Sequence, residues 1–205
     1  MAAPDIIVGL GHRKRVGKNE FGYMLADYLE DRGFNTQILA FAEAMKEMAA
    51  CIFDGYGLRN AHHYEINPEH KEQPLSVINK TPRQIWIEFG NAMRAIDPDI
   101  WVRIVRRAID GEMLREKLHH VRKPRAFIIT DVRFPNEADA IRSWGGHLAV
   151  IRRYLAPVSN DPAELALEWY GYWEWTVDNN GTLEHLAKQA ENYANFLMTP
   201  KRKQQ

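Results

Sequence analysis

The chain has 205 residues, 45% hydrophobic and 26% charged, which is enough apolar content to bury a core. Its 27 Lys and Arg residues balance 27 Asp and Glu residues, so no overall field draws it to nucleic acid or to a membrane. The single cysteine, Cys51, excludes an internal disulfide and fits a reducing cytoplasm. We expect neither a signal peptide nor a transmembrane helix, and any anion site must be built locally.

The first motif lies between an apolar run that ends at Leu10 and a segment with helical spacing. A basic turn followed by Gly17 and Lys18 matches the strand, loop and helix of a phosphate-binding P-loop. Backbone N–H groups at a helix start converge on one point, and the helix dipole adds partial positive charge there. The residues predicted to bind nucleotide phosphates are Arg13, Lys14, Arg15, Val16, Gly17, Lys18, Asn19 and Glu20.

Two positions depart from the G-x-x-x-x-G-K-[ST] pattern of P-loops. His12 occupies the position of the first glycine, with Gly11 one residue earlier, and Asn19 replaces the Ser or Thr that ligates magnesium. An amide oxygen can ligate magnesium directly or through a water. The alternative interpretation is an ordinary strand-to-helix turn with a solvated basic tip.

The segments after the loop alternate between helical and strand patterns. Residues 18–32 and 42–53 have the spacing of helices, and residues 35–41 read as a strand between them. This alternation predicts an α/β fold with a mostly parallel sheet. Residues 54–80 lose all periodicity, and we expect a flexible insertion near the acceptor site there. Its three histidines fit no zinc pattern, so we expect no metal in this insertion.

Two consecutive helices are predicted next, the first starting at the Thr81–Gln84 capping box and the second following Asp97-Pro98. Arg83 and Arg94 are eleven residues apart, about three helical turns, so they share a face.

That face is a candidate wall of a nucleotide site. Gly90 lies between the two arginines, where a close approach by a ligand or another backbone would justify a glycine. Trp86 or Trp101 could stack on a base. The alternatives are that both tryptophans belong to the core and that Gly90 serves helix packing.

The second half of the chain begins with a basic cluster at residues 115–125. This cluster could contact nucleic acid, but it lacks interleaved aromatic residues, so a solvated linker is the better interpretation. The elements expected after it are strands at 126–130, 147–151 and 177–180 and helices from 134, from 164 and over 182–197. Residues 155–175 are a candidate lid or helical segment.

Asp131 and Arg133 follow the predicted strand at 126–130. Ligands of open α/β sheets bind at the carboxyl ends of strands, so both residues are expected near Lys18. The carboxylate would bind magnesium, together with Asn19, and the guanidinium would bind a phosphate. The alternative is a structural Asp–Arg pair.

Four stretches together carry a family resemblance. They are Gly17-Lys18, Thr81 to Trp101, Asp131-Val132-Arg133-Phe134-Pro135-Asn136-Glu137 and Asn180-Gly181-Thr182-Leu183. With these motifs in this order, the chain resembles the deoxynucleoside monophosphate kinases of tailed bacteriophages, which are P-loop kinases. The resemblance spans most of the chain, and the Asp131–Glu137 stretch is its most specific part.

The resemblance implies one P-loop kinase domain over residues 1–205, with the three-layer P-loop NTPase-like fold. It also implies transfer of a phosphoryl group from ATP, with Mg²⁺, to a deoxynucleoside monophosphate. Lys18 would hold the ATP phosphates, and Asp131 would orient magnesium or the acceptor. Arg133 would bind the acceptor phosphate or the migrating group, and Glu137 would hold Arg133 or the sugar.

Arg83 and Arg94 would line the acceptor pocket by the same resemblance. The departures at His12 and Asn19 leave a second hypothesis open, a nucleotide-binding protein with weakened catalysis. Glu20 could instead supply the magnesium ligand that the missing hydroxyl would have provided. A third hypothesis is a kinase acting on modified bases within DNA. The expected partners are small-molecule nucleotides and no membrane, and the many tryptophans leave room for a homodimer face.

Overall fold

The computed structural model describes all residues except 1–4, 12, 120–122, 155–164 and 200–205. It divides into two compact units. The first, here called the sheet unit, contains Met1–Ala40 and Ile109–Gln205, and the second, the helical unit, contains Phe41–Ala108. The second unit is larger than the insertion at 54–80 that the sequence predicts, because it also takes in the helices on either side.

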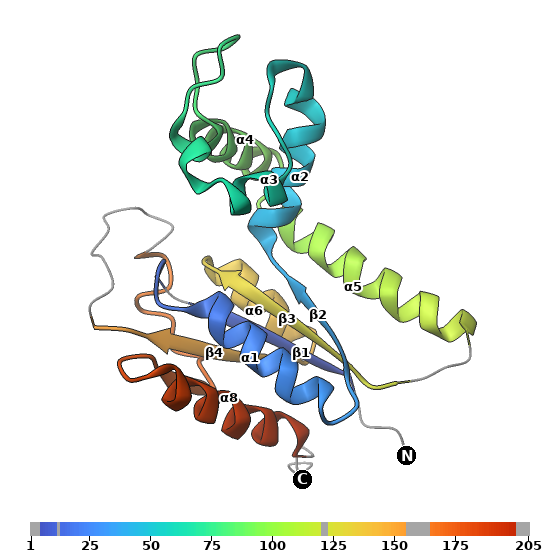
Figure 1. Ribbon diagram of the computed structural model, residues 1–205. Coiled ribbons are helices and arrows are strands. Elements are labelled where there is room, and N and C mark those ends of the chain that lie inside the picture. The colour runs from blue at the N-terminus through green and yellow to red at the C-terminus, as the bar shows by residue number, and fades with distance from the viewer. Residues whose placement is uncertain (1–4, 12, 120–122, 155–164, 200–205) are drawn as a thin grey trace. The chain divides into compact units, whose positions relative to one another are not determined.

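The sheet unit is built on parallel strands in the order β2-β3-β1-β4-β5 (Figure 1). The strands are β1 (Ile6–Gly11), β2 (Asn35–Leu39), β3 (Arg125–Val132), β4 (His147–Arg152) and β5 (Trp175–Asp178). Because β1 lies at the centre, its carboxyl end is flanked by the carboxyl ends of β3 and β4. The loop after β1 therefore opens at the middle of the sheet edge.

Helices cover both faces of this sheet, so the predicted three-layer α/β fold is confirmed (Figure 1). Helices α1 (Lys18–Glu30) and α8 (Leu183–Met198) pack together on one face, and α6 (Pro135–Ser143) packs on the other. Gly9 of β1 faces α6, where an added Cβ would lie 2.7 Å from Ile141 Cδ1. The glycine thus lets α6 approach the sheet closely.

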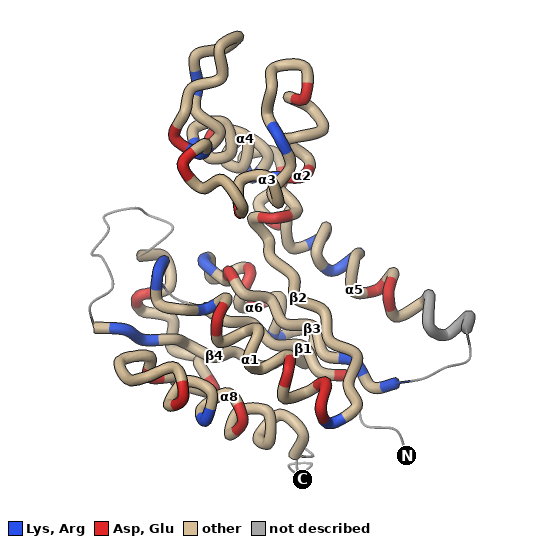
Figure 2. Tube along the Cα trace, in the orientation of Figure 1, with Lys and Arg blue, Asp and Glu red and all other residues tan. Residues whose placement is uncertain are grey.

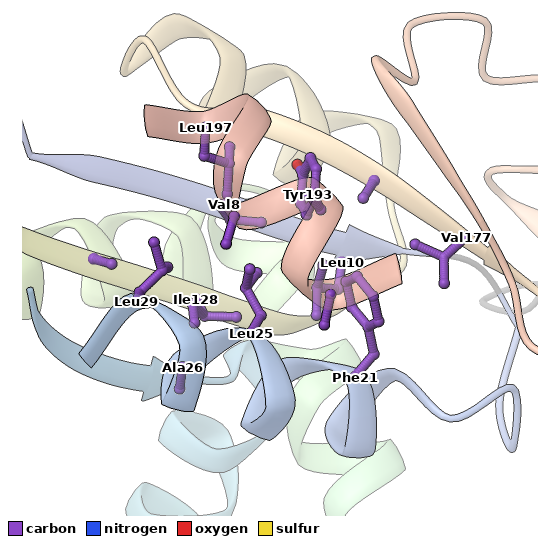
Figure 3. Close-up of a cluster of buried hydrophobic side chains, with 14 of the residues drawn as sticks. Val8, Leu10, Phe21, Leu25, Ala26, Leu29, Ile128, Val177, Tyr193 and Leu197 are labelled. Atoms are coloured by element: carbon purple, nitrogen blue, oxygen red, sulfur yellow. The ribbon is translucent and has the colours of Figure 1, made fainter. Parts of the chain in front are cut away.

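The main core of the sheet unit lies between the sheet and the α1–α8 layer (Figure 3). Alternate residues of β1, Val8 and Leu10, point to this side because successive strand residues face opposite ways. They meet Leu25 of α1 and Tyr193 of α8, and all four side chains are fully buried. Burying each such side chain stabilises the fold by about 1.5–3 kcal/mol, and together they fix α1 against β1.

The helical unit has a core of its own. Its elements are α2 (Phe41–Phe53), η1 (Asp54–Tyr56), α3 (Ala61–Ile66), η2 (Pro68–Glu72), α4 (Pro82–Ile96) and the first part of α5 (Ile100–His119). Leu58 and Tyr64, from the segment with no periodicity, pack with Ile85 and Trp86 of α4. The lost periodicity at 54–80 therefore marks helical turns too short to display a pattern, rather than a structureless loop.

Two predicted elements differ from the structure in their extent. The aromatic-rich helix expected from residue 164 to Trp173 does not extend through this segment. Among its described residues only Leu165 is helical, and turns follow at 166–169. Its aromatic side chains do not form one buried helical face, since Tyr170 packs edge-on against Tyr172 and Trp173 while Trp169 is exposed. Helix α5 extends to His119, into the expected linker at 115–125, and residues 120–122 of that cluster lie outside the described part.

Within the described residues, no helix combines the length and the apolar character that crossing a membrane requires.

Candidate functional site

The loop after β1 has the geometry of an anion-binding turn. Gly17 precedes the first residue of α1 with a φ of +90°, and Arg15 also has a positive φ, of 59°. Lys18 is only 8% exposed, and its Nζ donates a hydrogen bond to the Arg13 carbonyl at 2.6 Å. The lysine thus lies back over the loop, at the positive end of the helix dipole. His12 lies outside the described residues.

The remaining predicted loop residues differ in exposure. Asn19 and Glu20 are exposed in the first turn of α1, whereas Val16 is fully buried in the core. The buried valine anchors the loop to the sheet unit, and its neighbours Lys14 and Arg15 remain at the surface or half-buried. The loop therefore presents a cluster of cations on a fixed backbone.

Asp131 lies in an irregularity of β3 next to this loop. Gly9 pairs with Ile129 and Gly11 pairs with Val132, so one residue of β1 faces two of β3. A bulge of this kind re-aims side chains at a strand end. Asp131 is half-buried there, and Arg133 is the first residue after the strand. The structure thus brings both residues to the sheet edge that carries the loop after β1, where the sequence analysis expects them near Lys18.

Glu137 is 2% exposed at the start of α6. Its Oε2 accepts hydrogen bonds from the backbone N–H of Arg133 at 2.8 Å and of Phe134 at 3.1 Å. These bonds satisfy donors at the helix start that would otherwise be unpaired. The carboxylate therefore fixes the backbone that carries Arg133.

Sequence reasoning missed a further pair of arginines at the same edge. β4 pairs with β1 up to Gly11–Val150, so Arg152 and Arg153 lie beyond the level of Gly11. Both are exposed. Both arginines could have been predicted from the sequence, because they follow the predicted strand at 147–151. The same reasoning identified Arg133 after the strand at 126–130.

The segment from Leu165 to Glu174 packs against the loop after β1, a contact that sequence reasoning also missed. Arg13 donates through Nη2 to Glu168 at 2.7 Å, and the Trp173 ring fills the space that a Cβ on Gly11 would occupy. Tyr170 donates its hydroxyl hydrogen to Asp139 of α6 at 2.7 Å. Burial, reinforced by this bond, raises the Tyr170 pKa to about 12, so the hydroxyl remains a donor at neutral pH.

Lys and Arg residues gather where β1, β3 and β4 end (Figure 2). Those in the described part of the sheet unit are Arg13, Lys14, Arg15, Lys18, Arg133, Arg152 and Arg153. Because the chain as a whole has no net charge, the excess of positive charge at this edge is a local feature. Such an excess of positive charge suits a ligand that carries several phosphates.

Helix α4 of the helical unit carries the other predicted binding residues, and its arginines are accessible. Thr81 and Gln84 form the predicted capping box, with bonds of 3.1 and 2.9 Å. Arg83 is exposed and pairs with Glu72 across the surface of the unit. Arg94 is half-buried beside Gly90, where a Cβ would lie an ordinary 3.7 Å from Arg94 Nη1.

The two tryptophans predicted to stack on a base are core residues. Trp86 is 6% exposed, with Lys46 Nζ 5.3 Å from its ring centre and the Tyr64 ring edge-on at 5.0 Å. Trp101 is 2% exposed and packs against Phe89. Their rings already have protein partners, so the alternative interpretation as core residues describes them correctly. The helical period cannot distinguish a core stripe from a ligand-facing stripe.

The sheet edge that carries the loop after β1 offers two oxygen donors that could hold a magnesium ion. Among the described residues, no group of three or more His, Cys, Asp or Glu side chains is placed to hold a metal alone. Magnesium does not need such a cage, since it keeps several waters and takes ligands from substrate phosphates. One carboxylate, Asp131, and one amide oxygen, Asn19, fit that mode of binding.

Comparisons with known proteins add to this geometry. No protein-family model matches the sequence. The solved structure of APE1195 is similar with a TM-score of 0.48 at 15% identity, over 96% of this chain and 98% of that one. A protein of Acanthamoeba polyphaga mimivirus named "Putative deoxynucleotide monophosphate kinase" is 30% identical over 200 residues, 90% of this chain and 93% of the viral protein. With that identity over nearly the full length of both proteins, the chain belongs to the same family as this viral protein.

Proposed function

We propose that the protein is a deoxynucleoside monophosphate kinase, which transfers the γ-phosphoryl group of ATP to a deoxynucleoside monophosphate. The observation that carries the proposal is the buried Lys18 amine, held over a P-loop at a sheet edge that also bears Asp131 and Arg133. The viral relative's name supports the same class of reaction. A nucleotide kinase and phosphotransferase is thus the function that the site supports best.

In the proposed reaction, an oxygen of the acceptor phosphate forms a bond to the γ-phosphorus while the bond to the β–γ bridging oxygen breaks. The products are ADP and a deoxynucleoside diphosphate. Phosphoryl transfer needs positioning and positive charge more than covalent chemistry. The loop N–H groups and Lys18 would hold the ATP phosphates, and Arg133, fixed through Glu137, would neutralise charge on the migrating group.

Magnesium, when bound, would neutralise the β- and γ-phosphate oxygens, with Asp131 and Asn19 as its protein contacts. Arg152 and Arg153 extend the cationic edge and are further candidates for phosphate contacts. The acceptor would be held by Arg83 and Arg94, whose guanidinium groups suit a phosphate monoester.

A second candidate function is nucleotide binding with weak turnover. Asn19 favours it, because an exposed amide stands at the helix start where P-loops place a hydroxyl. Tight ATP binding without turnover on any acceptor would select this function over the first.

The test is a coupled ADP-release assay over a panel of ribo- and deoxynucleoside monophosphates. We expect acceptor-dependent, magnesium-dependent ADP formation with deoxynucleotides. Lys18→Ala should lower this turnover by about 10³-fold or more, as loss of a positioned cation does in phosphoryl transfer. Lys188→Ala is the matched control, since Lys188 is an exposed α8 lysine paired with Glu191. Wild-type turnover in Lys18→Ala would remove the basis of the proposal.

A further inference from the structure

The loop that follows β5 contacts the P-loop through one side chain. Asn179 donates an Nδ2 hydrogen bond to the Val16 carbonyl at 2.8 Å. The same amide nitrogen fills the position that a Cβ on Gly17 would take. Asn179 therefore lies against the Val16–Gly17 peptide, which leads into Gly17, the residue before α1 begins at Lys18.

The orientation of that peptide matters for phosphate binding. A trans peptide is planar, so its C=O and N–H point in opposite directions. When Asn179 holds the Val16 carbonyl, the Gly17 N–H must point away from Asn179. Glycine tolerates positive and negative φ almost equally, so the loop alone does not select this orientation. The hydrogen bond from Asn179 supplies the missing selection.

Asn179 is itself held on two sides. Its backbone N–H donates to the Arg152 carbonyl at the end of β4, at 2.9 Å. The preceding residue, Asp178, exchanges two hydrogen bonds with the Gln189 side chain of α8, at 2.8 and 2.6 Å. Asn180 accepts from the N–H of Tyr154 at 2.8 Å, so the same loop also holds the chain after Arg153. Such an anchored amide can position its partner.

We propose that Asn179 is a positioning residue that orients the Val16–Gly17 peptide, and hence the Gly17 N–H, for binding of the nucleotide's phosphates. Through its bond to Arg152 it also keeps the basic end of β4 in register with the P-loop. The proposal rests on the proposed function, because it assigns Asn179 a role in that same phosphate site. It assigns no contact between Asn179 and the base.

The test compares Asn179→Asp and Asn179→Ala with wild type. The aspartate has the same shape but places a carboxylate oxygen, in place of a donor, against the Val16 carbonyl. Asn195→Asp is the matched control, because Asn195 is exposed on α8. Its side-chain oxygen accepts a hydrogen bond from Arg32, and an aspartate oxygen can accept the same bond. Calorimetry would measure dissociation constants for magnesium-ATP and for inorganic tripolyphosphate, which has no base.

We expect Asn179→Asp to weaken both ligands by about tenfold or more and Asn179→Ala by about fivefold, the range for one backbone hydrogen bond. Asn195→Asp should bind both as wild type does. If Asn179→Asp fails to fold, Asn179→Ala decides the question. The ¹⁵N chemical shift of the Gly17 amide, measured by NMR without ligand, should change in both variants. If Asn179 contributed only to overall stability, this chemical shift would stay the same.

Two results would overturn the inference. One is wild-type affinity of both ligands for folded Asn179→Ala while Lys18→Ala loses them. The other is weakened ATP binding with unchanged tripolyphosphate binding, which would assign Asn179 to the base instead. Failure of the proposed function looks different, since Lys18→Ala would then bind and turn over ATP as wild type does.

Discussion

The two units hold their candidate residues in different ways. In the sheet unit, Lys18 and Glu137 are buried and make short bonds to the backbone. In the helical unit, Arg83 is exposed on the surface of α4, while the aromatic residues near it are packed inside. A buried, backbone-bound group costs little further entropy when a ligand arrives, whereas an exposed arginine must be ordered by the ligand. We infer a preformed phosphate site in the sheet unit and an adaptable acceptor surface in the helical unit.

The largest effect on the affinity for ATP should come from Gly17→Ala. Gly17 has a φ of +90°, and a Cβ would overlap the Asn179 amide, so both the loop backbone and its support must shift. We expect ATP affinity to fall by about 100-fold or more, since a misplaced phosphate loop loses several hydrogen bonds together.

Gly33→Ala is the matched control for that variant. Gly33 has nearly the same φ, +88°, but no described atom lies within 4 Å of its Cβ position. Both variants carry a similar strain of about 1–2 kcal/mol from the left-handed backbone, so both should unfold at lower temperature. Equal ATP affinities in the two variants would refute the view that the Gly17 loop is a preformed site.

The largest effect on turnover separates Arg133 from Arg83. Arg133→Ala should reduce kcat by about 10³- to 10⁵-fold with a small change in the KM for ATP, as loss of a transition-state arginine does. Arg83→Ala should mainly raise the KM for the acceptor, by about tenfold, since an exposed arginine contributes binding more than chemistry. Steady-state kinetics with both substrates varied would measure the difference, and a kcat loss in Arg83→Ala as large as that in Arg133→Ala would remove the distinction.

Trp86→Ala tests whether the helical unit carries its own stability. Trp86 is buried against Tyr64 and Lys46, so truncation should cost about 3–5 kcal/mol of unfolding free energy. Glu168, Trp173 and Asn179, which contact the loop after β1, belong to the sheet unit, so ATP binding should survive while acceptor-dependent turnover falls. Trp169→Ala is the control, since that side chain is 94% exposed and should change stability by about 0.5 kcal/mol at most. Loss of ATP binding in Trp86→Ala would show that the sheet unit's site depends on the helical unit.

The fold was predictable where the chain repeats a simple physical pattern. Buried parallel strands such as 126–130 are continuous apolar runs, and the capping box at Thr81 marks a helix start whatever surrounds it. The turns at 54–80 and 166–169 were not predictable, because they are too short for a period to appear. Their form depends on tertiary contacts such as that of Leu58 with the α4 core, which sequence spacing does not encode.

The candidate site was predictable to the extent that backbone geometry determines it. The Gly17-Lys18 motif and the strand end at Asp131 were expected at one shared edge of the sheet, and the strand register places them there, because parallel strands bring their carboxyl ends together. The contacts made by Asn179 and Glu168 join segments more than 150 residues apart in the sequence. The same helical spacing fits a buried tryptophan and one that meets a ligand, so Trp86 and Trp101 could only be assigned from their packing.

Gly90→Ala should give the smallest effect and decides what the glycine in α4 is for. A Cβ there would meet Met45 Cγ and Arg94 Nη1 at an ordinary 3.7 Å, so the protein itself has room for alanine. Replacing a mid-helix glycine should then raise the unfolding free energy by up to about 1 kcal/mol, measurable by denaturant titration. If the glycine only packs α4 against α2, kcat and the acceptor KM will not change. If a substrate approaches the helix backbone between Arg83 and Arg94, the added methyl group will raise the acceptor KM in a protein that has become more stable, which ordinary helix packing cannot explain.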